Sequence, residues 1–203
     1  MARLPSNPVA RRSSRTLVLA GLVASALLSA CEAPRPDSFV VDPVLYPAPD
    51  EEIRDVLVWP VIVVGESPLD GTMRDLLATR IYEGMINHRF SALAPSLVQQ
   101  LSKEFGVTEA GASKAVGAAD ADGVLVLTMS DWDEAGLYAL GKVRTRGEIK
   151  ILNKAGKVRW IGRFTVDSTL VPGESGNASL EEKRRQAVEA FARRLSRWLP
   201  DRL

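Results

Sequence analysis

The 203-residue sequence contains a single cysteine and a single histidine, and only 6% of its residues are aromatic. One cysteine cannot form an internal disulfide, so a disulfide-stapled fold is excluded. Cysteine and histidine are also too few to supply the four ligands of a structural zinc site. The 26 basic and 25 acidic residues nearly cancel. Because a balanced charge creates no field that attracts a phosphate backbone, we expect no nucleic-acid partner.

Motifs that would indicate an enzyme are missing as well. The sequence has no G-x-S-x-G elbow and no G-x-G-x-x-G or G-x-x-x-x-G-K-[ST] phosphate loop. The only histidine, His88, falls at the end of a predicted helix, which favours a position near the helix dipole over a catalytic one. Asp131, Asp133 and Glu134 could hold a calcium ion, but without EF-hand spacing a solvated acidic loop is the better interpretation. We therefore expect no catalytic residue, no metal ion and no cofactor.

A short apolar run near the start of the chain predicts a targeting segment. Residues 17–30 are fourteen uncharged residues that follow a cationic stretch with four arginines. At about 1.5 Å per residue this run is too short for a bilayer core of roughly 30 Å. We interpret residues 1–30 as a secretory signal peptide. Its end, Leu28-Ser29-Ala30-Cys31, resembles the lipobox of bacterial lipoproteins, in which the cysteine carries diacylglycerol.

The predicted lipid on Cys31 defines the location of the protein. Two or three acyl chains hold a soluble domain firmly at a membrane, since each buried methylene contributes about 0.8 kcal/mol. Glu32 follows Cys31 where enteric lipoproteins of the inner membrane usually have Asp, so we expect an outer-membrane anchor with the domain in the periplasm. An inner-membrane location stays open. The alternative for Cys31 is a buried or free thiol beside an ordinary cleavage site.

The segment after Cys31 is predicted to be a tether. Prolines are dense between residues 34 and 49, and this density favours extended chain over packed structure. We assign residues 31–52 to a proline-rich tether, in which Phe39 to Tyr46 could dock as an edge segment. Residues 53–203 are then one domain. From residue 31 onward the chain holds 22 basic and 25 acidic residues, because the signal peptide takes four of the basic ones.

The hydrophobic pattern of residues 53–203 predicts an α/β (α+β) fold. Strands are expected at 56–64, 90–93, 123–130, 138–152 and 158–166, and helices at 72–87, 96–106, 109–116 and 179–199. Pro60 indicates a bulge or a sheet edge within the first strand. This order predicts a mixed sheet of about five strands with helices packed on one face, ending in a β-hairpin and a C-terminal helix. Trp160, Phe164, Phe191 and Trp198 are expected in the core.

The hairpin carries a candidate binding patch. Charged and apolar residues alternate along 138–152, so the charged ones share one face of the sheet. The cations of this face are Lys142, Arg144, Arg146, Lys150, Arg159 and Arg163. They could bind an anionic envelope component or an acidic partner. The alternative is a solvated sheet face on which Glu148 and Asp167 dilute the positive charge.

Four sequence segments resemble a known family. They are the lipobox, VLVWP at 56–60, GAADADGVLVLTM at 117–129 and ILNKAGKVRWIG at 151–162. Together they resemble bacterial outer-membrane lipoproteins grouped with the curli-secretion channel lipoprotein and the amino-terminal domain of the periplasmic Tol-system protein. The resemblance implies a non-catalytic accessory of envelope assembly, secretion or transport that binds a protein partner or its own copies. The alternative is a cell-envelope hydrolase or peptidoglycan-modifying enzyme with an unrecognised site.

Overall fold

A seven-stranded mixed sheet organises the domain in the computed structural model, which describes residues 38–46, 51–65, 69–171 and 178–203. The strands are β1 (Ser38–Leu45), β2 (Asp55–Val58), β3 (Ile62–Val63), β4 (Ser91–Ala92), β5 (Gly123–Asp133), β6 (Lys142–Asn153) and β7 (Val158–Thr169). The helices are α2 (Gly71–Asn87), α3 (Pro95–Phe105), α4 (Glu109–Ala118), α5 (Leu137–Leu140) and α6 (Leu180–Ser196). The predicted signal peptide and Cys31 lie outside the described residues.

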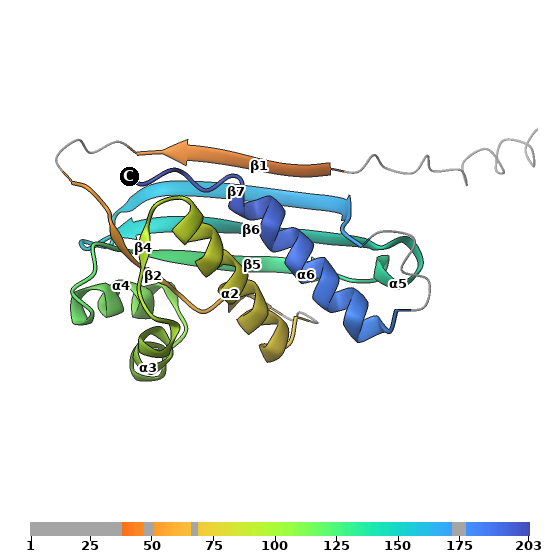
Figure 1. Ribbon diagram of the computed structural model, residues 1–203, viewed down its shortest axis with the longest axis horizontal. Helices are drawn as coiled ribbons and strands as arrows, with labels where there is room; N and C mark the ends of the chain where they lie inside the picture. Colours follow the sequence, from red (N-terminus) through yellow and green to blue (C-terminus); the bar gives the residue numbers. More distant parts are fainter. Residues whose placement is uncertain (1–37, 47–50, 66–68, 172–177) are drawn as a thin grey trace, which may run out of the picture. The chain divides into compact units, whose positions relative to one another are not determined.

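The strand order is β1-β7-β6-β5-β2-β4, and β3 also pairs with β5 (Figure 1). β2, β3 and β4 run parallel to their neighbours, whereas β5, β6, β7 and β1 form an antiparallel meander. The α+β class, the mixed sheet, the β6–β7 hairpin and the C-terminal helix are therefore confirmed. The sheet has seven strands and not about five, partly because the expected strand at 56–64 divides at Pro60 into β2 and β3.

β1 lies in the segment that we expected to be tether. It pairs antiparallel with β7 from Ser38 opposite Asp167 to Leu45 opposite Trp160, so the sheet begins before residue 53. This edge position is the one anticipated for a docked segment at 39–46. Tyr46 donates its N–H to the Arg159 carbonyl. Because backbone N–H and C=O groups alternate in direction along a strand, residues 44 and 42 also direct these groups towards β7, and residues 45 and 43 direct them away. Pro43 therefore turns its nitrogen away from β7, where no N–H is needed.

Helices cover both faces of the sheet, and not one face as expected. α2 and α6 pack with Val56, Val58 and Leu125 in the larger core cluster. α3 and α4 pack with Leu57, Trp59, Val124 and Val126 in the second cluster. Because successive side chains of a strand point to opposite faces, the two clusters lie on opposite sides of β2 and β5. The continuous apolar runs of these strands require cover on both faces.

The helices that frame the larger core begin at side-chain caps. Asp70 accepts a hydrogen bond from the Met73 N–H at the start of α2, and Ser179 accepts one from the Glu182 N–H at the start of α6. Phe191 is fully buried as expected, but Trp198 follows the end of α6 and is 43% exposed. None of the helices in the described residues combines the length and apolarity needed to span a membrane.

Candidate functional site

The antiparallel part of the sheet turns a charged face away from α2 and α6. We call this surface the polar face. Its members come from four adjacent strands: Val40 and Asp42 of β1; Arg163, Thr165 and Asp167 of β7; Arg144, Arg146, Glu148 and Lys150 of β6; and Thr128, Asp131 and Asp133 of β5. Most of these side chains are exposed or half-buried. The opposite faces of the same strands carry buried residues such as Thr145, Ile149 and Phe164.

The strand register places acidic residues beside the cations of the polar face. Arg163 lies between Asp42 and Glu148, its directly opposite neighbours on β1 and β6. The Arg144 guanidinium is 3.8 Å from an Asp133 carboxylate oxygen and 3.9 Å from one of Asp167. The face therefore combines both signs of charge and is not a uniformly cationic stripe. Cross-strand pairs of opposite charge stabilise a sheet modestly.

Lys150 connects the polar face to α4. Its Nζ atom is 2.6 Å from Glu148 Oε1 and 2.9 Å from Glu109 Oε2. Burial lowers the pKa of the Lys150 ammonium, but the hydrogen bonds to the two carboxylates outweigh this effect and raise the pKa above its ordinary value. Lys150 is thus held as a charged group between a strand and a helix. Of the predicted patch, Arg144, Arg146, Lys150 and Arg163 share the polar face, and Lys142 begins the same strand.

Arg159 does not belong to this face. The residue is only 6% exposed, and its Nη1 atom donates to Glu51 Oε2 at 2.8 Å while Nε donates to the Tyr46 carbonyl at 3.1 Å. Asn153 donates to the same Glu51 carboxylate. The register of β6 and β7 shifts beside Ile151, so Arg159 has no opposite residue on β6. This bulge redirects the side chain and breaks the alternation from which its position was predicted.

The acidic loop is held by internal contacts and not by solvent alone. Glu134 Oε1 accepts a hydrogen bond from Trp132 Nε1 at 2.8 Å, and Oε2 accepts one from Arg184 Nε at 2.5 Å. Asp133 Oδ1 accepts the Ala135 N–H. Across the described parts of the chain, no group of three or more His, Cys, Asp or Glu residues is arranged to bind a metal ion.

His88 occupies the helix end that the sequence assigned to it. It caps the C-terminus of α2, where its backbone N–H donates to carbonyls of the last turn. Its ring Nδ1 lies 3.2 Å from Asp201 Oδ1 near the end of the chain.

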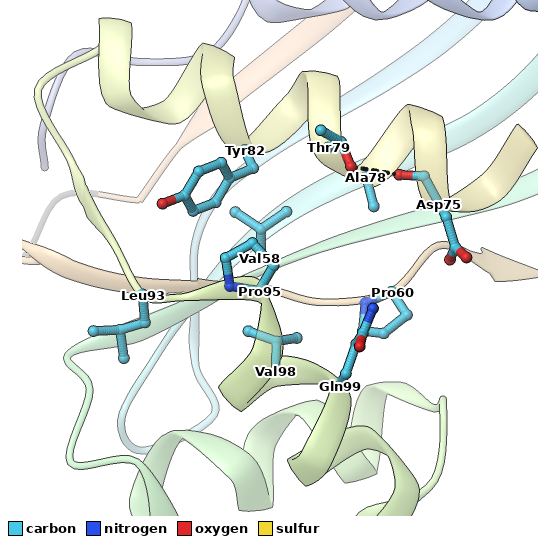
Figure 2. A pocket seen from close by; sticks show the side chains of 10 residues that line it. All are labelled: Val58, Pro60, Asp75, Ala78, Thr79, Tyr82, Leu93, Pro95, Val98 and Gln99. Carbon is cyan, nitrogen blue, oxygen red and sulfur yellow. Dashed lines mark hydrogen bonds between the residues drawn. The ribbon is translucent and has the colours of Figure 1, made fainter. Parts of the chain in front are cut away.

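One small pocket lies between α2 and α3 beside the C-terminal end of β2 (Figure 2). Its lining combines residues of three segments: Val58 and Pro60; Asp75, Ala78, Thr79 and Tyr82; and Leu93, Pro95, Val98 and Gln99. The cavity volume is about 80 Å³, whereas small-molecule sites usually measure about 300–1,000 Å³. It therefore has room for one small side chain or a few waters. Sequence reasoning missed this pocket because its walls are distant in the chain.

Comparisons with known proteins give structural similarities only. No protein-family model and no curated protein sequence matches this chain. Among solved structures, the PelC dodecamer from Paraburkholderia phytofirmans is similar at 15% identity and a TM-score of 0.48, covering 78% of this chain and 96% of that one. Lipoprotein GNA1162 from Neisseria meningitidis is similar at 16% identity and 0.43, covering 71% and 99%.

A third similar structure is the LpoB C-terminal domain from Salmonella enterica, at 14% identity and a TM-score of 0.42, covering 57% of this chain and 84% of that one. At these identities and scores, no residue and no role is carried from these proteins to this chain. The relation to the curli-secretion lipoprotein and the Tol-system protein stays a prediction.

Proposed function

We propose that this chain is a non-catalytic lipoprotein, anchored through Cys31 to the outer membrane with its domain in the periplasm. The proposal rests on one observation, the position of the only cysteine directly after a fourteen-residue uncharged run and two small residues. Lipid attachment requires a cysteine at that position, whereas a free thiol could occur anywhere in the chain. The domain then serves envelope assembly, secretion or transport by binding a protein partner or further copies of itself.

Metabolic labelling with an alkyne analogue of a fatty acid tests the anchor. The parent protein is expected to take up the label and to sediment with membranes. Cys31→Ala should lose the label and accumulate as precursor or as a soluble periplasmic product. Ser29→Ala is the matched control, because it keeps a small residue before the cysteine and should be labelled like the parent. Labelling and fractionation of Cys31→Ala like the parent would overturn the proposal.

We propose the polar face as the surface that binds the partner. Arg146 and Arg163 form no ion pair within the described residues, so their guanidinium groups are available to carboxylates of another protein. Neighbouring acids such as Asp42 and Asp131 would meet cations of that protein in turn. Charges arranged in this way favour a partner of matching pattern and disfavour others more than they raise affinity.

Photo-crosslinking in cells tests this surface. A photoreactive amino acid at Thr165, which lies between Arg146 and Val40 in the register, should yield one adduct of defined mass. The same amino acid at Lys103, exposed on α3, should not yield it. Arg146→Ser with Arg163→Ser should diminish the adduct, while Lys103→Ser leaves it unchanged. Equal adducts from positions 165 and 103, or an adduct unaffected by the double substitution, would exclude the polar face.

The alternative function, an envelope hydrolase, requires a carboxylate and a nucleophile close together in a deep cleft. The pocket between α2 and α3 holds one carboxylate, Asp75, in a space of about 80 Å³. Thr79, a hydroxyl residue of the same pocket, donates to the Asp75 carbonyl. This geometry gives no support to a hydrolytic site in that pocket.

A further inference from the structure

One end of the sheet combines the start of β1 with the short helix α5. Ser38, the first residue of β1, lies opposite Asp167 on β7, which in turn lies opposite Arg144 on β6. α5 ends two residues before β6 begins, so it belongs to the same end of the sheet (Figure 1). The hairpin turn around Ala155 lies at the opposite end of β6 and β7.

This end exposes two large apolar side chains. Tyr138 is 68% exposed and Leu140 is 64% exposed, the largest values for large hydrophobic residues in the described parts of the chain. Leu137 of the same turn is fully buried. The Leu137 side chain therefore packs α5 against the core, while the side chains of Tyr138 and Leu140 are exposed.

The exposed pair is held in place by specific contacts. Lys183 of α6 is only 8% exposed, and its Nζ atom donates to the Tyr138 carbonyl at 3.0 Å and lies 4.6 Å from the centre of the Tyr138 ring. Gly141 ends the turn at φ 62°, and a Cβ atom there would lie 2.2 Å from the Val171 carbonyl oxygen. A buried ammonium and a glycine that cannot be replaced thus fix an apolar surface that faces away from the protein.

The length of the segment between Cys31 and Ser38 limits how far this surface can lie from a membrane that holds Cys31. Cys31 is seven residues before Ser38. A fully extended chain spans at most about 3.6 Å per residue, so the lipidated residue would lie within about 25 Å of the start of β1. Tyrosine and leucine are residues that enter the boundary between lipid headgroups and acyl chains.

The charges near α5 do not oppose such a contact. Arg184 is paired with Glu134, and Arg144 lies between two aspartates. These ion pairs cancel locally, and the Lys183 ammonium held against Tyr138 adds a positive charge, so no repulsion from an anionic lipid surface is expected. The contact would therefore be mainly apolar.

We propose that Tyr138 and Leu140 insert into the surface of the same membrane that holds Cys31, so that the domain rests on the bilayer by its α5 end. The inference depends on the lipid anchor proposed above and adds a second contact, which fixes the orientation of the domain. With the α5 end on the membrane, the β6–β7 turn faces away from it.

A fluorescent probe on the full lipidated protein tests this orientation. Ala139, exposed between the two residues, is replaced by cysteine and labelled with a nitrobenzoxadiazole dye, because an acylated Cys31 cannot react. The matched control carries the dye at Ala155, which is exposed in the β6–β7 turn. Both proteins are reconstituted into vesicles of phosphatidylethanolamine and phosphatidylglycerol, with or without lipids that carry a nitroxide on the acyl chain.

The dye at position 139 should show blue-shifted emission and at least twofold quenching by the nitroxide lipids, and the dye at 155 should show neither. Tyr138→Ser with Leu140→Ser should return the signal at 139 to that at 155. Equal emission and quenching at 139 and 155 on vesicle-bound protein would overturn the docking while leaving the anchor intact. Dye on Cys31 itself, with failure of the protein to float with vesicles, would overturn both proposals.

Discussion

Gly84 of α2 lies so close to Ser196 of α6 that a Cβ atom at position 84 would be 2.5 Å from Ser196 Oγ and 2.9 Å from its Cβ. The Ser196 hydroxyl donates to the Ala192 carbonyl within its own helix. The two helices that cover the larger core therefore cross at a point where only glycine fits. If the Ser196 side chain rotated to make room for a Cβ atom, its hydroxyl would lose the hydrogen bond to the Ala192 carbonyl.

We expect Gly84→Ala to destabilise the domain by about 1–3 kcal/mol, the usual cost of overpacking. Chemical denaturation measures the effect. Gly117→Ala in α4 is the matched control, because a Cβ atom there meets nothing within 4 Å and alanine stabilises a helix by roughly 0.5–1 kcal/mol. Adding Ser196→Gly to Gly84→Ala should recover part of the loss. Equal stability of the two alanine variants would contradict the close crossing.

Trp160 and Trp198 should respond differently to truncation. Trp160 is 3% exposed and belongs to the larger core cluster, whereas Trp198 is 43% exposed. Trp160→Ala should lower the free energy of unfolding by roughly 3–5 kcal/mol, as for other buried aromatic residues. Trp198→Ala should cost much less. Thermal unfolding of both variants checks this, and a Trp160→Ala protein that melts with the parent would refute the hairpin register.

Removing the partner of a buried guanidinium should cost more than breaking a surface pair. Glu51→Ala removes the carboxylate that accepts from the buried Arg159 guanidinium at 2.8 Å, and a loss of about 1–3 kcal/mol is expected for an incompletely paired buried group. Arg54 and Glu52 form an ion pair whose side chains are 60% and 45% exposed, so Arg54→Ala should change stability by about 0–1 kcal/mol. Similar urea midpoints for both variants would argue against a structural role for Arg159.

The Asp120–Lys154 pair predicts a pH dependence. A hydrogen bond from Lys154 lowers the pKa of the exposed Asp120 carboxyl, and the same contact raises the pKa of Lys154. The pair therefore contributes stability above the ordinary aspartate pKa, and the contribution is lost as pH falls through the lowered pKa of Asp120. It is lost again as pH rises through the raised pKa of Lys154. Lys154→Met should raise the Asp120 pKa in a carboxyl NMR titration; an unchanged pKa would show that the contact is absent in solution.

Local patterns predicted the elements of this fold better than their assembly. The helices α2 and α6 and the β6–β7 hairpin depend on residues close in sequence, and all three were predicted. The cover of both faces of β2 and β5 was missed, although the unbroken apolar runs of these strands pointed to it. The proline content led us to assign the segment of β1 to a tether. The segment forms a strand nevertheless, because an edge strand tolerates proline where a central strand does not.

The candidate site was predicted less completely because it depends on irregular backbone. Strict alternation placed Arg144, Arg146 and Arg163 on one face, but it failed at Arg159, where β7 bulges. It also extended the β6 strand back to Tyr138, whereas the chain forms a helical turn that ends at Gly141 in the left-handed region. Neither the bulge nor this turn follows from the period of the sequence, because each is set by contacts with distant residues.

The outward orientation of Pro43 limits how two copies of this domain can meet at their β1 edges. A free sheet edge normally offers a row of donors and acceptors on which another strand can add. On β1 that row lacks a donor at Pro43, near its middle, so two chains held side by side cannot join their β1 strands into one continuous ladder. With the lipid anchor proposed above, crowding on a membrane would bring these domains into contact without fusing their β1 edges, and a contact between copies at this end of the sheet order would use side-chain surfaces instead.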